Sequence, residues 1–546
     1  MPHTRPAAVC LAVLVLLTAG HAVRAGRFQS FTERFKDSPD QATVAAATYL
    51  GGEGTEWLVG GGFQPDGTVV LVGNALGPAL RVAGKDAAVI GGRDAPAPPP
   101  PQRQPEMRRG KPKTRKDGSV VYEPFGWETP GGTAFVVRLS GDMTRVLSVT
   151  RFPWQAGSAC GACVDASGAI YVAGLASDRT ASLAADAKAL EPPAVESKLP
   201  ERHVYLAKLA PDGSRVAWVR HVTGPSAAPD VSVAADGTLR FRGPALRTFG
   251  ADGTLRGTTV VPGGLSEKIA VNPTDGTYAY GHEHHWRTGR EPWRCPVLNI
   301  HRPDGTLLYH LYDWGGPYVG LNNLRLVSDS AVREVAYDAD GNLVIYAWSD
   351  GGNSVMYREP MDVRTPAPGM KGLGMSAWGA GVLSCAYILR IETTDYHVAG
   401  GTLWLAFLSE RDRPNSIWID TLGFAADGSV AAGGRAAWGL IQTGNHLNAG
   451  GEPGGPYVAV FSPDFASLRF ASAMNACGAT EVRNNDRWAF ITGRPGGKPV
   501  LLAVCGAAKE EQGYNQGKPA PTVGAVQPAF GGGYTDGHAL LLDLSR

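Results

Sequence analysis

A short pattern of apolar strand, Asp-Gly turn and apolar strand recurs along this chain and constrains its fold more than any other feature. Residues 63–75 read FQPDGTVVLVGNA, residues 164–176 read VDASGAIYVAGLA and residues 337–349 read YDADGNLVIYAWS. Asp-Gly between alternating apolar residues is a strong hairpin signal, because glycine tolerates the positive φ that such turns need. One copy would be an ordinary hairpin, whereas many copies predict a repeat architecture.

Two kinds of hairpin alternate, so that four strands, A to D in chain order, make one unit. The first kind occupies residues 55–75, 158–176, 228–243, 266–281, 330–348, 415–434 and 479–493. The second kind includes TAFVVRLSGDMTRVLSVTRF at 133–152 and HVYLAKLAPDGSRVAWVRHV at 203–222. A lone four-stranded sheet would expose both apolar faces, and stacking such sheets around an axis buries them. The pattern therefore predicts an all-β fold, a seven-bladed β-propeller of four-stranded antiparallel blades.

The two ends of the chain predict how the ring closes. The last blade has no fourth strand of its own, and the strand ATVAAATYLGG at 42–52 has no other partner, so we expect these ends to pair. A single propeller domain would then span residues 42–546, after a lead segment at 26–41. Its blades are expected at 55–152, 158–222, 228–261, 266–314, 330–408, 415–474 and 479–546 with 42–52.

Several of these segments resemble a known repeat. TYLGG at 48–52, VDASGAIYVAG at 164–174, TAFVVRL at 133–139 and HVYLAKL at 203–209 are similar to the repeats of bacterial seven-bladed β-propeller proteins of the SBBP type. The resemblance covers most of the chain from residue 42, with degenerate later copies. It implies the propeller fold and little about activity, because the distinctive residues are turn and core positions.

The N-terminus has the pattern of a signal peptide. Arg5 supplies a positive charge, residues 7–19 form a short apolar run, and small residues follow at Ala22 and Ala25. A buried strand or an uncleaved anchor is the competing interpretation. We expect residues 1–25 to be removed and the protein to be exported to the periplasm, the cell surface or the medium. No other apolar run approaches the roughly 20 residues of a membrane span, and the mature chain is expected to be a monomer.

Charge and cysteine content limit the partners and the redox chemistry. The net charge of +1 gives no electrostatic basis for nucleic-acid binding. Cys160 and Cys163 form a C-x-x-C pair with no following His and no second such pair, so a local disulfide or two buried thiols is expected rather than catalysis. Cys477 and Cys505 fall in one repeat and are the second candidate disulfide.

The connections between strands divide into two faces. The A–B and C–D turns are short and share one face, whereas the longer B–C and D–A connections share the other, which is the candidate functional surface. The B–C insertion of blade one, 94–118, contains PAPPPPQRQPEMRRGKPKTRKDG and predicts an extended, mobile loop. It is either an adhesive arm for an acidic polymer or membrane, or a solvated insertion.

Two groups of residues on this second face are candidate sites. GHEHHW at 281–286 offers a metal site at His282, His284 and His285, with Glu283 as an added donor and a plain polar loop as the alternative. Aromatic and amide side chains suit a carbohydrate, although several of the tryptophans could instead pack between blades. These carbohydrate candidates are Trp286, Trp314, Tyr318, Asn322, Asn323, Trp348, Asn353, Trp438, Asn445 and His446.

Catalytic motifs are absent from the sequence in the forms that carry known chemistry. There is no G-x-S-x-G elbow, no H-E-x-x-H and no phosphate-binding loop, and the recurring aspartates occupy turns. We therefore expect a non-enzymatic exported scaffold that binds a cell-surface polysaccharide or a protein, with no cofactor apart from the candidate metal. The alternative is a polysaccharide hydrolase or lyase with its site at the channel mouth of the same face.

Overall fold

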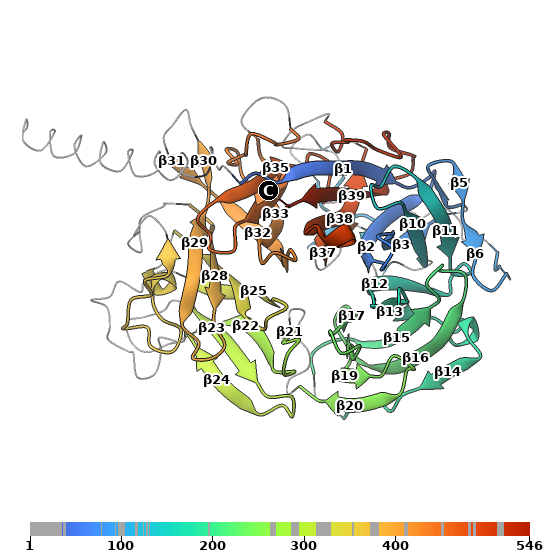
Figure 1. The fold of residues 1–546 in the computed structure, drawn as a ribbon, viewed down its shortest axis with the longest axis horizontal. Helices are drawn as coiled ribbons and strands as arrows, with labels where there is room; N and C mark the ends of the chain where they lie inside the picture. The colour runs from blue at the N-terminus through green and yellow to red at the C-terminus, as the bar shows by residue number, and fades with distance from the viewer. Residues whose placement is uncertain are drawn as a thin grey trace, which may run out of the picture.

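Antiparallel sheets stand side by side around a central axis in the computed structural model of this chain, as Figure 1 shows. The structure describes Phe35 and residues 40–545, with these internal exceptions: 36–39, 78, 93, 97–103, 115–117, 119, 124, 127–128, 130–131, 195–196, 262–268, 286–293, 313–328, 352–353, 372–381, 409–412, 449–452, 479–481, 484–487 and 510–517. Apart from Phe35, helix in this described part is limited to short 3-10 turns such as Thr180–Leu183, Ser354–Tyr357 and Pro495–Gly497. The chain is an all-β propeller.

Five blades are separate sheets of four or five strands. The first is β17 (Asp230–Val233), β18 (Leu239–Arg242), β19 (Leu246–Phe249) and β20 (Leu255–Thr259). The second is β21 (Ile269–Val271), β22 (Tyr278–His285), β23 (Arg294–His301) and β24 (Leu307–Leu311). The third is β25 (Ser330–Tyr337), β26 (Leu343–Ser349), β28 (Cys385–Ile391) and β29 (Val398–Trp404), with β27 (Met370–Lys371) at its edge.

The other two separate blades close the ring. One is β32 (Ile417–Phe424), β33 (Val430–Ala436), β34 (Gly455–Phe461) and β35 (Leu468–Ala473). The other is β37 (Trp488–Gly493), β38 (Val500–Ala508), β39 (Thr535–Asp543) and β1 (Thr43–Leu50). Short pairs outside the blades are β4 (Arg81–Val82) with β5 (Lys85–Asp86), β30 (Ala406–Leu408) with β31 (Arg413–Asn415), and β9 (Phe125–Gly126) with β36 (Val482–Arg483).

The seven separate blades expected from the repeats are therefore corrected to five, because the eight long strands that follow β1 belong to one ten-stranded sheet. A parallel bridge between Thr133 of β10 and Gly157 of β12 joins the two units that the sequence separates. The members are β2 (Thr55–Phe63), β3 (Val69–Leu76), β6 (Ala88–Val89), β10 (Thr133–Leu139), β11 (Val146–Arg151), β12 (Gly157–Val164), β13 (Ile170–Ala176), β14 (Asp186–Ala189), β15 (Glu201–Leu209) and β16 (Val216–Pro225).

The Asp-Gly segments form the tight turns that the sequence predicts. In the β2–β3 hairpin, Gly67 has a φ of 84° and its amide donates to the carbonyl of Gln64 at 2.9 Å. The Asp66 carboxylate accepts the amide of Thr68 at 2.9 Å, which holds the turn closed. The segment 338–342 is also such a turn, since the Asp338 carboxylate accepts the amides of Asp340 and Asn342. Aspartate at these positions is explained by turn hydrogen bonds.

The middle strands are apolar on both faces because each blade packs against two neighbours. In β26, the residues from Leu343 to Ala347 are consecutive and each is at most 2 % exposed. Alternate side chains of a strand point to opposite faces, so such a run must be covered on both sides. This packing is the burial that the repeat predicts for stacked sheets.

The ends of the chain pair as expected. β1 runs antiparallel to β39, with Thr43 opposite Asp543 and Leu50 opposite Gly537, and the two strands lie side by side in Figure 1. This confirms that residues 42–52 supply the fourth strand of the last blade. Phe35, upstream of β1, is fully buried with its ring edge-on to Trp404 at 5.9 Å.

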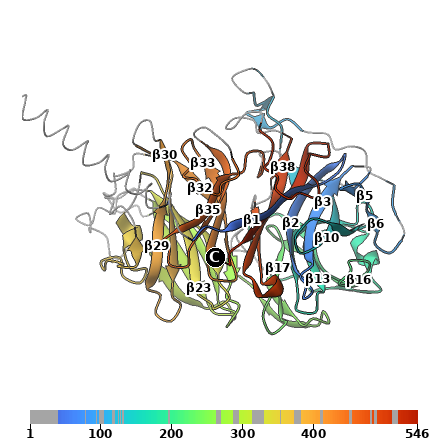
Figure 2. The same ribbon diagram turned by 45° about the horizontal axis from the view of Figure 1, so that its top comes forward.

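The long insertion of the first repeat differs from the extended loop that we expected. β7 (Met107–Arg108) and β8 (Lys111–Pro112) form a small hairpin, and the Lys113 ammonium lies 2.8 Å from the Glu106 carboxylate. Asp94 at its start is paired with the largely buried Arg151. The β7–β8 hairpin, drawn in light blue, projects from the ring in Figure 2. Local ion pairs and backbone hydrogen bonds thus order part of a segment whose composition favours an extended chain.

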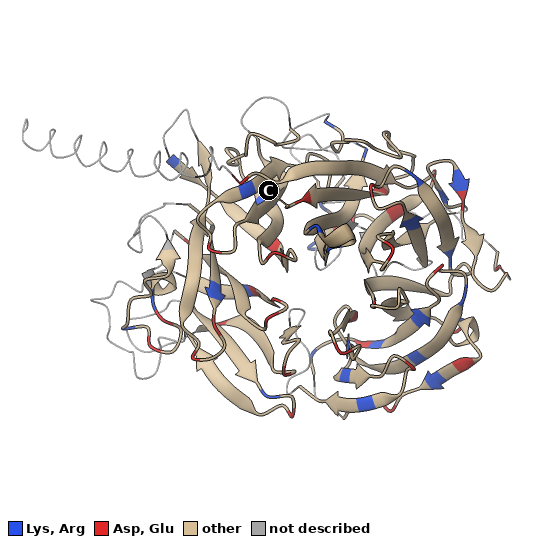
Figure 3. Cartoon of the chain, viewed as in Figure 1, with Lys and Arg blue, Asp and Glu red and all other residues tan. Residues whose placement is uncertain are grey.

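Lys and Arg positions alternate with Asp and Glu positions around the ring in the view of Figure 3. This distribution agrees with the net charge of +1. In the part of the chain that the structure describes, no helix is long and hydrophobic enough to cross a bilayer.

Candidate functional site

A cavity of about 850 Å³ lies within the ring and is walled by the innermost strands. The contributing strands are β2, β12, β17, β21, β25, β32 and β37. Asp230 at the start of β17 and Trp488 at the start of β37 line one end of this axial cavity, whereas Gln64, Asp165 and Arg494 of the A–B turns line the other end. The end at Asp230 and Trp488 faces the B–C and D–A connections, which we call the loop face. The loop face comprises the described residues within 77–132, 177–200, 350–384, 437–454 and 509–534 of the B–C connections and within 474–478 of the D–A connections. The volume of the axial cavity is within the range of ligand pockets.

The cavity wall combines charged and aromatic side chains. Asp230 is half exposed, and its carboxylate lies 3.5 Å from the guanidinium of Arg242. The amide of Val231 donates to the same carboxylate at 2.8 Å. Phe63 and Phe490, both half-buried, add aromatic rings to the wall. Fixed charge beside aromatic surface is a combination that recognises polar ligands with apolar faces, such as sugars.

The C-x-x-C pair lies in this wall. Cys160 occupies the β-bulge of β12, and both Cys160 and Cys163 are thiols rather than a disulfide in the structure. Burial, with a smaller contribution from the Asp230 charge, raises the pKa of both thiols. Protonated thiols are poor nucleophiles, so this environment favours a structural role over redox catalysis. The Cys160–Cys163 disulfide stays a prediction.

Six of the ten predicted carbohydrate residues lie outside the described residues, and nothing is concluded about them. They are Trp286, Trp314, Tyr318, Asn322, Asn323 and Asn353. The remaining four come from two regions of the loop face, the end of β26 and the 437–454 connection.

Trp348, at the end of β26, belongs to an ion-pair cluster. The guanidinium carbons of Arg294 and Arg333 each lie 5.4 Å from the centre of a Trp348 ring. Glu283 pairs with both arginines, at 3.2 and 2.9 Å, and Asp329 pairs with Arg294 at 2.9 Å. The hydrogen bonds that Arg294 donates to Asp329, together with the charge of Glu283, raise the pKa of Arg294. Stacking of a sugar on Trp348 would require displacement of a guanidinium group, so ligand binding there stays a prediction.

The three predicted residues of the 437–454 connection have different surroundings. Trp438 is 44 % exposed, and its backbone carbonyl accepts the Asn415 side-chain amide at 2.8 Å. Asn445 instead joins the connection to the chain's beginning, because its side chain accepts from Thr443 and donates to the carbonyl of Ala42. His446 bonds the Thr443 carbonyl through Nδ1 at 2.7 Å. Trp438 is thus the exposed aromatic of this group.

The predicted histidine metal site is only partly described. His282 and His284 lie on β22, opposite Val297 and Cys295, while the side chain of His285 lies outside the described residues. Both ring nitrogens of His282 have partners: Nδ1 is 3.0 Å from the Glu283 carbonyl and Nε2 is 3.1 Å from the Asn299 amide. His282 and His284 belong to no group of three donors among the described residues. A metal there stays a prediction.

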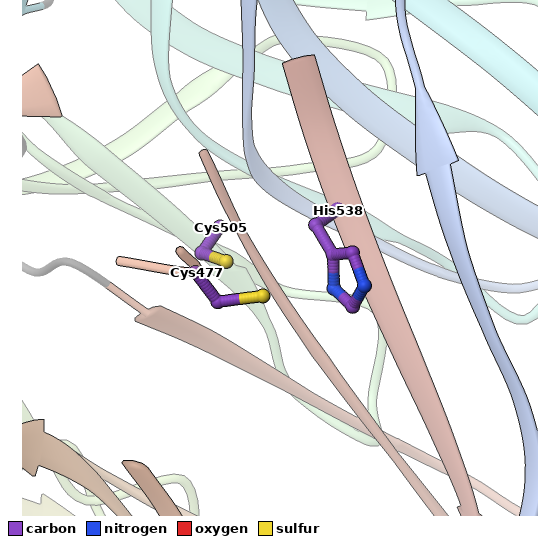
Figure 4. Close-up of side chains that lie close together, drawn as sticks. All are labelled: Cys477, Cys505 and His538. Atoms are coloured by element: carbon purple, nitrogen blue, oxygen red, sulfur yellow. The ribbon is translucent and has the colours of Figure 1, made fainter. Parts of the chain in front are cut away.

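A different group of three donors meets beneath the loop face. Cys477, Cys505 and His538 each offer one ligand atom, and these atoms all lie within 4.8 Å of one another. Figure 4 shows the sulfur of Cys477 turned toward a ring nitrogen of His538. All three residues are at most 1 % exposed. Cys477 and Cys505 are thiols in the structure, and the predicted disulfide between them stays a prediction.

The imidazole of His538 is held at one nitrogen only. Nε2 bonds the carbonyl of Pro521 at 2.9 Å, whereas Nδ1 is buried with no hydrogen-bond partner. Burial lowers the pKa of His538 to about 4. The ring is therefore neutral near pH 7, which is the form in which imidazole binds metals.

Two buried carboxyl groups lie between β2 of the ten-stranded sheet and β39 of the blade that closes the ring. Glu56 accepts the amide of Gly52 at 3.2 Å, and Asp536 accepts the amide of Gly531 at 2.6 Å. Burial raises the pKa of Glu56, with a further contribution from Asp536, and burial raises the pKa of Asp536 to about 7. Both residues are fully buried, so neither carboxyl group touches solvent.

Sequence reasoning selected Cys477 and Cys505 as a pair but missed His538, Glu56 and Asp536. The signal for His538 was its place in an apolar strand, TDGHALLLD, where a polar residue requires a partner. Its proximity to Cys477 depends on a D–A connection that returns beside β38, with Cys477 bridged to Ala507. No sequence motif marks this return of the chain, which is a feature of the tertiary structure.

Comparison with known proteins gives similarity at a coarse level. No family model matches the chain, and no curated protein matches it. Among solved structures, Sqt1 from Chaetomium thermophilum is 11 % identical to this chain, with a TM-score of 0.32. The match covers 76 % of the present chain and 90 % of Sqt1. Porphyromonas gingivalis dipeptidyl peptidase 4 is 10 % identical over 68 % of this chain and 41 % of that chain, with a TM-score of 0.27. The described strands themselves define the class: a β-propeller whose blades are antiparallel sheets of four strands.

Proposed function

We propose that this chain is an exported, non-enzymatic scaffold that binds a segment of a cell-surface polysaccharide at the loop-face end of the axial cavity. The observation that carries the proposal is the cavity of about 850 Å³ whose wall joins the Asp230–Arg242 pair with aromatic rings. Carboxylate and guanidinium groups bond sugar hydroxyls, and aromatic rings pack against the apolar faces of sugars. Trp438, exposed on the same face, would extend the contact beyond the cavity.

The proposal is tested by binding of the full chain to an array of bacterial surface glycans, followed by calorimetry with the glycan bound best. Asp230→Asn is expected to weaken that binding about tenfold, because a charge-assisted hydrogen bond contributes roughly 1.5–3 kcal/mol. The substitution keeps the size of the side chain and its capacity to accept from Val231.

Asp252→Asn is the matched control. Asp252 is likewise an acceptor of a backbone amide, from Thr254 at 3.0 Å, but it lies in a turn outside the cavity wall. Binding by this variant should equal that of the parent. Absence of any glycan binding at high protein concentration, or equal effects of the two variants, would contradict the proposal. If the chain instead captures a protein from cell-surface extracts, that protein rather than a polysaccharide is the partner.

The alternative, a hydrolase or lyase, would find its carboxyl pair in Glu56 and Asp536, whose pKa values are raised as an acid catalyst requires. Their complete burial places them out of reach of a polymer. We therefore prefer the scaffold. Release of reducing ends from the bound glycan, abolished by Asp536→Asn, would favour the alternative.

We also infer that the ring consists of seven repeat units of the SBBP type. Support comes from the strand order within the ten-stranded sheet, where β2–β3–β10–β11 and β12–β13–β15–β16 each follow the order of a separate blade. The innermost strands of seven such units line the axial cavity. Export follows from the signal-peptide pattern, and N-terminal sequencing of the secreted chain tests it.

A further inference from the structure

We infer that Cys477, Cys505 and His538 form a structural zinc site beneath the loop face. Their three donor atoms lie within 4.8 Å of one another. Two sulfurs bound to one zinc ion at about 2.3 Å in a tetrahedral arrangement lie roughly 3.8 Å apart. Closing the group around an ion therefore needs shifts of about 1 Å, which side-chain rotation supplies.

The histidine is oriented as metal-binding histidines usually are. Its Nε2 is fixed by the Pro521 carbonyl at 2.9 Å, and a second hydrogen bond of this kind sets the tautomer and ring orientation at metal sites. The opposite nitrogen, Nδ1, is buried without a partner, and Figure 4 shows a ring nitrogen turned toward the Cys477 sulfur. A buried acceptor without a partner is costly, and a cation at this position would satisfy it.

Charge balance selects the metal. Two thiolates compensate the charge of one Zn²⁺, so the occupied site is neutral, as a fully buried position requires. Cu⁺ bound by two thiolates would leave a net negative charge among apolar neighbours such as Trp488 and Leu540. Sulfur and imidazole donors suit Zn²⁺, whereas Ca²⁺ and Mg²⁺ require oxygen. The fourth position of the tetrahedron is left to a water molecule or another small ligand.

The three donors belong to separate segments that the ion would join. Cys505 of β38 lies opposite His538 of β39, and Cys477 belongs to the D–A connection that enters this blade. Through Pro521, the His538 ring also contacts the B–C connection of the same blade. The ion would therefore fix two connections of the loop face against the blade that closes the ring.

The test uses the full exported chain, purified without a histidine tag and kept reduced. We expect one zinc per chain by elemental analysis after desalting, and a higher melting temperature with zinc than after chelation. Cys477→Ser, Cys505→Ser and His538→Gln should each lose the stoichiometric zinc and the zinc-dependent stabilisation. Cys385→Ser and Cys163→Ser, which remove thiols from other blades, should retain both.

Cobalt substitution of the unaltered chain keeps the proposal testable where a variant fails to fold. Thiolate-to-cobalt charge-transfer absorption, with the d–d bands of a tetrahedral site, supports the assignment, and their absence overturns it. Binding of Cu⁺ but not Zn²⁺ would overturn the choice of metal. A Cys477–Cys505 disulfide in the exported protein, found by mass spectrometry together with a lack of zinc, would overturn the site.

Discussion

Single glycines explain why the second strand of the repeated hairpin ends in small residues. A Cβ at Gly174 would lie 1.7 Å from the Ser158 carbonyl oxygen, and one at Gly434 would lie 2.1 Å from the Trp418 carbonyl oxygen. Both glycines face the point where a β-bulge interrupts the preceding strand. The bulge turns a carbonyl toward the neighbouring strand and leaves no space for a side chain. The small residue of the repeat is therefore a steric requirement.

Gly174→Ala is expected to lower the free energy of unfolding by about 2 kcal/mol, because overpacking against fixed backbone typically costs 1–3 kcal/mol. Urea denaturation followed by tryptophan fluorescence measures this difference. Gly400→Ala is the control, since the nearest heavy atom to its Cβ is 3.6 Å away. We expect a change of less than about 0.5 kcal/mol in the control. Equal effects at the two positions would contradict the steric explanation.

At the scale of elements, the sequence predicted the hairpins of the blades but not the short strand pairs outside them. The hairpin predicted at 158–176 is observed as β12 and β13, Gly157–Val164 and Ile170–Ala176. Strand periodicity and turn residues act over a few neighbours, so they can be recognised in sequence. The β7–β8 hairpin and the parallel β9–β36 pair were missed, because short pairs depend on contacts rather than on pattern.

The β15–β16 pair carries a titratable contact between strands. His203 Nε2 lies 3.2 Å from His221 Nδ1, and burial, with the charge of His221, lowers the pKa of His203. A histidine whose pKa is lower in the folded than in the unfolded protein contributes to stability at pH values above its unfolded pKa of about 6.5. This contribution is lost as the pH falls through its pKa in the folded protein. The raised pKa values of Asp536 and Glu56 act in the opposite direction in parent and variant alike, so the test is the difference between the two proteins. We expect the change in melting temperature from pH 7.5 to pH 5.5 to be less negative in His221→Gln than in the parent.

His397→Gln is the control for this pH dependence. The hydrogen bond between His397 Nδ1 and the accepting carboxylate of Asp395 raises the pKa of His397, so the stabilising contribution of this pair is present in acid and lost as the pH rises. His397→Gln should make the change in melting temperature from pH 7.5 to pH 5.5 more negative than in the parent, opposite to the effect of His221→Gln. Thermal unfolding by circular dichroism at the two pH values measures both. The same pH dependence in His221→Gln as in the parent would contradict the explanation.

At the scale of the whole molecule, one arginine connects both ends of the chain. Arg469 of β35 is 5 % exposed and donates to the carbonyl of Asp40 at 3.2 Å and to the carbonyl of Leu544 at 2.8 Å. Its own carbonyl accepts the amide of Ala42 at 2.8 Å. The blade that precedes the closing blade therefore holds the first and last segments in place, in addition to the β1–β39 pairing.

Arg469→Lys should destabilise the closure, because lysine cannot reach both carbonyls with one planar group and leaves buried acceptors unpaired. We expect a loss of about 2–4 kcal/mol and faster hydrogen exchange in β1 and β39. Arg390→Lys is the matched control, since Arg390 also donates to a backbone carbonyl, that of Gly428 at 2.7 Å, away from the termini. Exchange in β1 and β39 should be unchanged in the control. Uniform exchange changes in both variants would contradict a closure role for Arg469.

The sequence by itself determined the all-β architecture, the Asp-Gly turns and the pairing of the first strand with the last, because each depends on local residue pattern or on counting strands. Only the tertiary structure decided that Thr133 bridges to Gly157 and merges two units into one sheet. It alone placed His538 beside Cys477, and Asp230 in the wall of the axial cavity. Such contacts join segments far apart in the chain, and no periodicity records them.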